Sequence, residues 1–183
     1  MRAALSAAGS EAVDDRVYTL RSRNQVLDRA RAMLGRAREI VLGDLFPGPL
    51  DALAADLAAA AARGARVVVK TYGRHDVPGI AEVPEPDAAR ALSEWPGQQL
   101  SLVVDADEHL LALFDGSLSS ARQSVWSRST FLSCLHHNRL AMELLHTAWK
   151  GRGDTLVGIS LLSARPPGLR RLQEQGSGLD FIF

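Results

Sequence analysis

Residues 97–128 read GQQLSLVVDADEHLLALFDGSLSSARQSVWSR, and this stretch decides the fold. Two apolar runs, residues 100–104 and 109–114, flank a short break that begins at Asp105. That pattern predicts a β-hairpin. Because both runs are nearly continuous in apolar residues, we expect strands that are covered on both faces. The rest of the chain is then expected to cover this sheet.

A second unit precedes the hairpin. Residues 39–43 and 66–72 have the composition of short buried strands, and the Ala-rich segment 50–63 between them has the pattern of a helix. Gly64 stands where a left-handed residue commonly ends a helix. Strand, helix and strand joined by short connections predict a parallel βαβ unit with a right-handed crossover.

Two further helices are predicted from apolar residues at helical spacing. The first spans residues 24–38, with Asn24 as its N-cap. The second spans residues 130–149, with Ser129 as its cap and with an inward face made of Leu132, Leu135, Met142, Leu145 and Trp149.

Three segments have weaker patterns. Residues 17–20 are expected to form a short strand or an extended arm. Residues 73–98 have no clear period apart from a short helix at 87–93, and long surface excursions of this kind often carry binding loops. The apolar residues 179–183 are expected to dock as a strand or against a partner.

Length and charge limit the class of protein. A chain of 183 residues predicts one domain, here 16–183, preceded by a linker or tail at 1–15. The 21 basic and 21 acidic residues give a net charge of zero, which argues against a dedicated nucleic-acid surface. A single cysteine, Cys134, excludes an internal disulfide. No apolar run approaches the ~20 residues of a membrane span, so a cytoplasmic protein with no membrane contact is expected.

Most enzyme signatures are missing from the sequence. It contains no phosphate-binding loop, no dinucleotide-binding glycine pattern, no nucleophile elbow, no H-E-x-x-H and no C-x-x-C. His136 and His137 are adjacent on a predicted helix and therefore point about 100° apart, which is poor geometry for one metal ion. We therefore expect neither a metal site nor a cofactor.

The opening stretch resembles the second half of phospholipase D-like enzymes. There a strand carries H-x-K-x(4)-D and is followed by a turn, a second strand and a Gly-Ser pair. Asp105 falls at the Asp position, Gln98 at the His position and Leu100 at the Lys position, and residues 116–117 supply Gly-Ser. An amide cannot form a phosphohistidine, and leucine brings no charge to a phosphoryl oxygen. The resemblance implies an α/β, phospholipase D-like mixed sheet flanked by helices on both faces, without a catalytic centre.

More of the chain resembles the C-terminal effector-binding domain of TrmB-like transcriptional regulators. The similarity covers about residues 17–152. It includes an L-x-x-L-x-x-A-x-x-R-G-x-x-V passage, represented here by Leu53, Leu57, Ala61, Arg63, Gly64 and Val67, and the Val-Trp-Ser-Arg segment 125–128. It implies a non-catalytic regulatory domain that dimerises and binds a small polar effector such as a sugar. TrmB-like proteins read DNA through an N-terminal winged helix-turn-helix, which the residues before Val17 are too few to encode, so DNA contact is expected only through a separate domain.

A ligand of a parallel sheet is expected beyond the carboxyl ends of its strands. The residues predicted there are Asp44, Tyr72, Arg74, His75, Trp126, Ser127 and Arg128. Carboxylate and guanidinium groups bind polar ligands, and aromatic rings stack on sugars. Each has a structural alternative: Asp44 as a helix cap, Trp126 as core filling, Arg128 as a surface or interface charge, and His75 as a solvated loop residue.

Two other functions stay open at this point. One is a phosphodiesterase or nuclease with a non-standard site that uses His109, His136 or His137. The other is a self-association module that binds no ligand and uses the sheet or the apolar tail.

Overall fold

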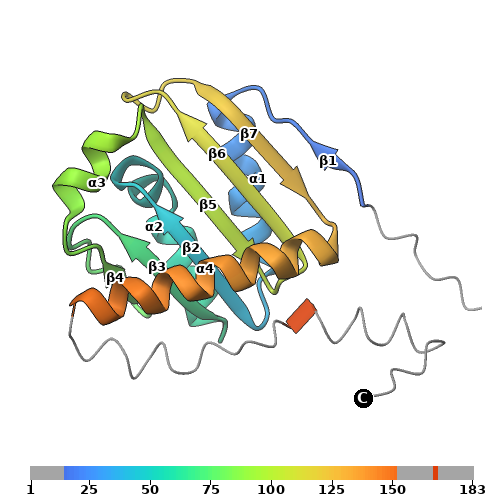
Figure 1. The fold of residues 1–183 in the computed structure, drawn as a ribbon. Coiled ribbons are helices and arrows are strands. Elements are labelled where there is room, and N and C mark those ends of the chain that lie inside the picture. Colours follow the sequence, from blue (N-terminus) through green and yellow to red (C-terminus); the bar gives the residue numbers. More distant parts are fainter. Residues whose placement is uncertain (1–14, 152–166, 169–183) are drawn as a thin grey trace, which may run out of the picture.

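The computed structural model describes residues 15–151 and 167–168, and within them a seven-stranded mixed sheet is flanked by helices on both faces (Figure 1). The strands are β1 Val17–Tyr18, β2 Ile40–Leu45, β3 Arg66–Thr71, β4 Ala81–Pro84, β5 Gln98–Val104, β6 Glu108–Phe114 and β7 Ala121–Ser127. The helices are α1 Arg23–Arg36, α2 Pro47–Ala62, α3 Ala88–Glu94 and α4 Thr130–Gly151. The predicted α/β class is confirmed.

The strands lie in the order β1-β7-β6-β5-β2-β3-β4. Strands β2, β3 and β4 are parallel to one another, and every other neighbouring pair is antiparallel. The predicted βαβ unit is β2-α2-β3, and the predicted hairpin is β5-β6. Gly64 has a φ of +98°, in the left-handed region that its place after α2 requires.

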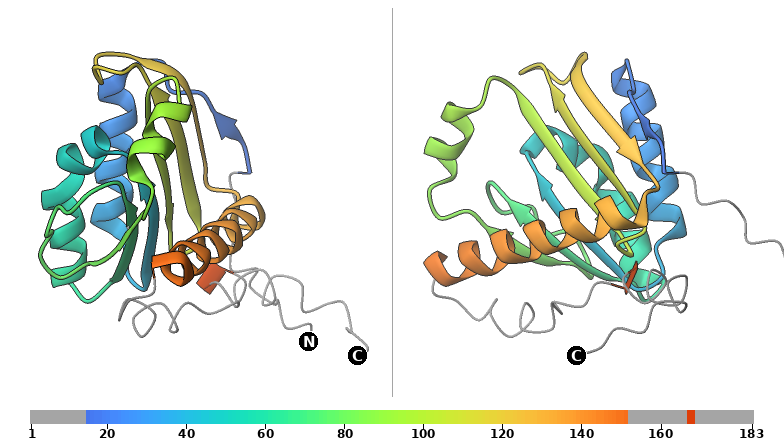
Figure 2. Two further views of the ribbon diagram at one scale, coloured as in Figure 1. Left: turned by 60° about the vertical axis from the view of Figure 1, so that its left-hand side comes forward. Right: turned by 45° about the vertical axis from the view of Figure 1, so that its right-hand side comes forward.

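Helices α1 and α2 cover one face of the sheet, and α4 crosses the other (Figure 2). The larger core lies beneath α1 and α2, and the alanines of α2 let it approach the strands closely. The smaller core lies under α4, where Leu140 and Leu144 pack on Leu42 and Val103. Helix α4 crosses one end of β5 and β6, so the expectation of strands covered on both faces holds there and fails farther along, where Leu111 is half-buried.

The predicted inward face of α4 is wrong. The side chains of Leu132, Leu135, Met142 and Trp149 are exposed, and Phe131 lies among them, while Leu145 packs at the edge of the smaller core. The face that meets the sheet is made of small, polar and branched residues: Ser133, Cys134, His137, Leu140, Ala141, Leu144, Thr147 and Ala148. Apolar spacing alone cannot distinguish the two faces, because the buried face of α4 mixes apolar residues with polar ones such as Ser133, His137 and Thr147.

Several boundaries differ from the prediction. Ser22, rather than Asn24, caps α1, since its side chain accepts a hydrogen bond from the backbone N–H of Gln25. Helix α2 begins at Pro47 with Phe46 as its N-cap, so Asp44 does not cap it. The aperiodic segment contains an unpredicted strand, β4, beside β3, as well as the predicted short helix, α3. Val17 and Tyr18 form the expected short strand.

The expected tail at residues 1–15, apart from Asp15, and the expected docking of residues 179–183 lie outside the described residues. Among the helices that the structure describes, none combines the length and the apolar character needed to cross a membrane.

Candidate functional site

A cavity of about 640 Å³ opens on the α4 face of the sheet. Its floor is formed by strands β2, β3, β5, β6 and β7. Helix α4 contributes His136, Arg139 and Glu143 to its wall, and α3 contributes Glu94 to its rim beside Trp95. The site therefore lies where α4 leaves the sheet uncovered.

The strand register orders the floor of the cavity. One row runs across five strands through Lys70, Asp44, Ser101, Leu111 and Val125. A second row runs through Gln99, Leu113 and Gln123. Residues opposite one another in paired strands share a face, so these side chains all belong to the α4 side. The floor is polar over β3, β2 and β5 and becomes apolar over β6.

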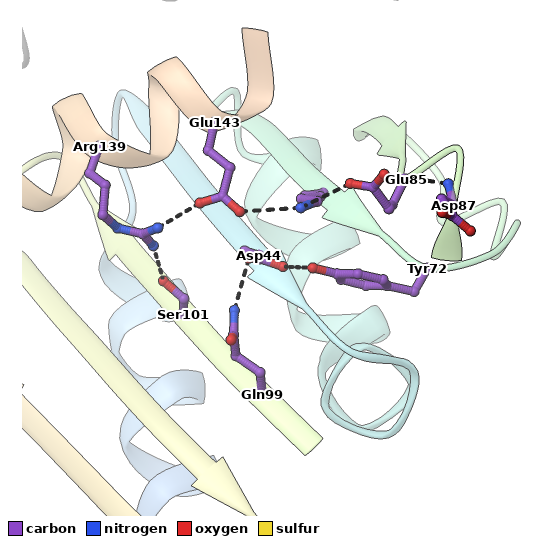
Figure 3. A network of polar contacts seen from close by, with 9 residues as sticks. Asp44, Tyr72, Glu85, Asp87, Gln99, Ser101, Arg139 and Glu143 are labelled. Atoms are coloured by element: carbon purple, nitrogen blue, oxygen red, sulfur yellow. Dashed lines mark hydrogen bonds and ion pairs between the residues drawn. The ribbon is translucent and has the colours of Figure 1, made fainter. Parts of the chain in front are cut away.

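Asp44 lies at the centre of the polar part (Figure 3). Its Oδ1 accepts a hydrogen bond from the Tyr72 hydroxyl at 2.9 Å, and its Oδ2 accepts one from Nε2 of Gln99 at 2.8 Å. Burial, reinforced by the negative charge of Glu143, raises the pKa of Asp44 to about 6. Burial and the neighbouring Asp44 also raise the pKa of Tyr72, so its hydroxyl stays a donor.

A chain of ion pairs borders Asp44 (Figure 3). Nζ of Lys70 lies 3.2 Å from Oε1 of Glu143 and 3.2 Å from Oε2 of Glu85. Nη1 of Arg139 lies 2.5 Å from Oε2 of Glu143. Burial opposes the charge of Glu143, but Lys70 and Arg139 hold its pKa below the ordinary value. Burial likewise opposes the charge of Lys70, yet Asp44 and Glu143 raise its pKa. Lys70 and Glu143 therefore remain charged near neutral pH.

Histidines extend the network toward β6. Nε2 of His136 lies 2.9 Å from Oγ of Ser101, which also accepts a hydrogen bond from Nη2 of Arg139 at 3.2 Å. Nδ1 of His109 lies 2.9 Å from Oγ of Ser133, and the His109 and His136 ring centroids are 5.7 Å apart. Burial, with the nearby Arg139 charge, lowers the pKa of His136 to about 3, and burial lowers the pKa of His109. Both imidazoles are therefore neutral at pH 7.

This arrangement offers a ligand several kinds of hydrogen-bonding group within one cavity. Carboxylates accept, the Gln99 amide and Arg139 donate, and the Ser101 hydroxyl does both. Trp95 at the rim is half exposed and meets Phe46 edge-on, with ring centroids 6.5 Å apart. Mixed donors and acceptors beside an aromatic face match the chemistry of a polyhydroxylated molecule.

Of the predicted ligand-binding residues, the structure brings Asp44 and Tyr72 together in this cavity. Arg74 follows β3 and is exposed. His75 turns toward α2, where its Nδ1 lies 3.3 Å from Oδ1 of Asp51.

The Trp-Ser-Arg segment lies away from the cavity. Trp126 faces α1, where its Nε1 donates to Oε2 of Glu108 at 3.2 Å and the Arg29 guanidinium carbon lies 3.8 Å from its ring centroid. Ser127 is buried, and its hydroxyl donates to the carbonyl oxygen of Arg16 at 2.9 Å. Arg128 is exposed at the turn before α4.

The residues compared with the phospholipase D motif occupy structural positions. Oε1 of Gln98 accepts a hydrogen bond from the backbone N–H of Gly48 at 3.1 Å, at the start of α2. Leu100 is fully buried in the larger core. The carboxylate of Asp105 accepts three backbone hydrogen bonds, from Arg38 at 3.0 Å and from Glu39 and Ile40 at 2.8 Å. It joins the hairpin turn to the start of β2.

Sequence reasoning did not single out most of the residues that surround Asp44: Lys70, Gln99, Ser101, Arg139 and Glu143. A signal was present, because Gln99 and Ser101 are polar residues two apart in an apolar strand and therefore share a face. Arg139 and Glu143 are one helical turn apart in α4. The pairing of the strands and the position of α4 across them bring these residues together around Asp44, and neither can be read from the local sequence.

Comparison with known proteins supports the fold. No protein-family model matches the chain, and no curated sequence is similar enough to be a relative. Solved structures are similar in fold. One is TrmBL2, an archaeal chromatin protein with a novel mode of DNA binding, which is 15% identical with a TM-score of 0.50. Another is NucT from Helicobacter pylori, which is 10% identical with a TM-score of 0.54. The match to TrmBL2 covers 79% of this chain and 55% of that one, and the match to NucT covers 74% and 98%. This chain thus spans about half the length of TrmBL2, and at such identities the likeness shows a shared fold.

Proposed function

We propose that this chain is the effector-binding domain of a TrmB-like transcriptional regulator and that the cavity over Asp44 binds a small polar metabolite such as a sugar. The observation that carries the proposal is the cavity itself, in which Asp44, Gln99 and Ser101 face Arg139 and Glu143 across a space of about 640 Å³. That volume is within the usual range for small-molecule sites. The domain acts by binding, and no residue is assigned a catalytic role.

The fold shared with TrmBL2 supports the regulatory part of the proposal. TrmBL2 binds DNA, and for the present protein we place DNA binding in a separate winged helix-turn-helix. The net charge of zero agrees with a domain that binds a small effector and does not itself bind DNA.

A thermal-shift panel tests ligand binding. Neutral mono- and disaccharides, nucleosides and nucleotides are added singly while the melting temperature is followed. A ligand at 100 times its dissociation constant adds about 2.7 kcal/mol to the folded state, which corresponds to a rise of about 5–10 °C for a chain of this size. A panel without any stabilising compound contradicts the proposal.

Homodimer formation is part of the same proposal. It is supported by the exposed face of α4, where Phe131, Leu132, Leu135, Met142 and Trp149 lie on one side of the helix. Large apolar side chains gathered on one exposed face are typical of protein interfaces. Light scattering at increasing protein concentration tests this part, and a monomer at high micromolar concentration contradicts it.

A phosphodiesterase is the competing function, and His136 beside Ser101 is the observation that favours it. The ion-paired state of Lys70 and Arg139, whose charges are already compensated by Glu143, favours binding instead. A phosphodiester and nuclease assay separates the two functions. Turnover by the unmodified protein that disappears in the His109→Ala variant would contradict the ligand-sensing proposal and support a catalytic function.

A further inference from the structure

The proposed ligand site has two chemically different halves. Over β2 and β5 the floor holds Asp44, Gln99 and Ser101, whose polar atoms are engaged in the network described above. Over β6 and β7 the first row continues as Leu111 and Val125, and the second continues as Leu113 and ends at the polar Gln123 on β7. The change from polar to apolar thus takes place between two adjacent strands, β5 and β6.

The apolar half is open rather than part of a core. Leu111, Leu113 and Val125 are half-buried, and all three line the cavity. Their neighbours on the opposite face, Leu110 and Phe114, are fully buried under α1 and α2. Helix α4 crosses the other end of β6, where His109 is buried and lies within hydrogen-bonding distance of Ser133.

Distance along the row sets the size of a ligand that fills both halves. Neighbouring strands lie about 4.8 Å apart, so Asp44 on β2 and Leu111 on β6 are separated by about 10 Å, and Val125 on β7 by about 15 Å. A free monosaccharide head group engaged at Asp44 leaves the apolar half in contact with water. An alkyl or aryl group attached to that head group removes this apolar surface from water.

We propose that the cavity floor over β6 and β7, formed by Leu111, Leu113 and Val125, is an apolar subsite for an alkyl or aryl substituent of the polar ligand. The natural effector is then an amphiphilic molecule, such as a glycoside, with its polar head at Asp44 and Gln99 and its apolar group on Leu111 and Leu113. This inference rests on the proposed ligand site and specifies the class of its ligand.

Fluorescence of N-phenyl-1-naphthylamine tests the subsite, because this neutral aryl probe brightens in apolar surroundings. One probe per chain is expected, with at least tenfold weaker binding in Leu113→Gln. The near-isosteric Val125→Thr provides a second, milder change if Leu113→Gln fails to fold, and weaker binding is expected there too.

The exposed face of α4 is the competing apolar surface, so Met142→Gln is the matched control and should bind the probe like the unmodified protein. Absent binding, or binding that Met142→Gln removes and Leu113→Gln keeps, overturns the inference.

Displacement of the probe then tests whether one ligand spans both halves. Hexyl β-glucoside should displace it at a concentration at least tenfold lower than methyl β-glucoside, since each buried methylene strengthens binding about fourfold. Equal potency of the two glucosides, or displacement by neither, overturns the inference. If sugars raise the melting temperature but the alkyl chain adds nothing, the proposed function stands without an apolar subsite, whereas failure of the whole ligand panel removes both.

Discussion

The hydroxyl of Tyr72 donates a hydrogen bond to Oδ1 of Asp44 at 2.9 Å, on the sheet face that α4 only partly covers. The hydrogen bond stabilises the charged carboxylate. Burial and the negative charge of Glu143 destabilise the charged form more strongly, so the pKa of Asp44 rises to about 6. The charged form of the Asp44 carboxylate is thus disfavoured in the folded protein. Groups of this kind are common at functional sites.

The first prediction concerns the pH dependence of stability. The folded-state pKa of Asp44, about 6, lies above its ordinary value of 3.8, so the folded state binds more protons between these values. Stability contributed by Asp44 therefore falls as pH rises from about 4 to about 6, by about 3 kcal/mol. In Asp44→Asn this loss is absent. The difference in unfolding free energy between variant and unmodified protein should grow over that pH range and stay constant above pH 7.

Urea unfolding at several pH values measures this difference. The asparagine amide is nearly isosteric with the carboxylate, and Gln99 can rotate its own amide to present an oxygen, so the packing is retained. A difference that does not change between pH 4 and pH 7 would show that Asp44 titrates normally.

The second prediction concerns Asp105, which resembles part of a catalytic motif but acts structurally. Its carboxylate accepts backbone hydrogen bonds from Arg38, Glu39 and Ile40. Asp105→Ala leaves three N–H groups without these acceptors and should lower the unfolding free energy by about 3–5 kcal/mol. Asp105→Asn keeps one acceptor oxygen and should cost less. Chemical denaturation checks the order, and an alanine variant as stable as the unmodified protein would rule out this role.

The third prediction tests which face of α4 meets the sheet. Leu144 is fully buried and Met142 is 67% exposed. Leu144→Ala should destabilise the protein by about 2–5 kcal/mol, and Met142→Ala should change stability by less than about 0.5 kcal/mol at a protein concentration low enough to prevent association. If urea unfolding shows that Met142→Ala is the more destabilising variant, the face of α4 that the sequence predicted to be buried is the one that meets the sheet.

The fourth prediction uses the tryptophans as reporters. Trp95 stands half exposed at the rim of the cavity, while Trp126 is buried on the opposite face of the sheet and Trp149 is exposed on α4. Ligand binding should therefore change the fluorescence of Trp95. The change should vanish in Trp95→Phe and persist in Trp149→Phe. A signal that survives Trp95→Phe would place the ligand elsewhere.

Local pattern was sufficient to predict much of the fold. The apolar runs predicted the β5-β6 hairpin, and the strand-helix-strand spacing around α2 predicted its parallel pair. Strand β4 was missed because it is only four residues long and begins after a loop with no period. The exposed face of α4 was mistaken for its buried face because Leu135, Met142 and Trp149 repeat every seven residues, a spacing that also characterises helix interfaces.

The site was predicted only in part because its residues come from separate elements. Asp44 and Tyr72 follow from the rule that ligands bind at strand ends. Glu143 and Arg139 lie about 100 residues farther along, and nothing in the local sequence indicates that α4 crosses above β2. The same rule predicts Trp126 at the site, whereas the parity of its position in β7 places it under α1.

Calorimetric titration of the panel's most stabilising compound tests the central claim that the cavity over Asp44 binds a small polar ligand. Gln99→Leu keeps the side-chain size but removes the amide that contacts Asp44, and Met142→Ala changes the same protein outside the cavity. We predict stoichiometric binding to the unmodified protein and to Met142→Ala, and at least tenfold weaker binding to Gln99→Leu. Equal affinity for all three proteins, or no binding to any of them, would contradict the account.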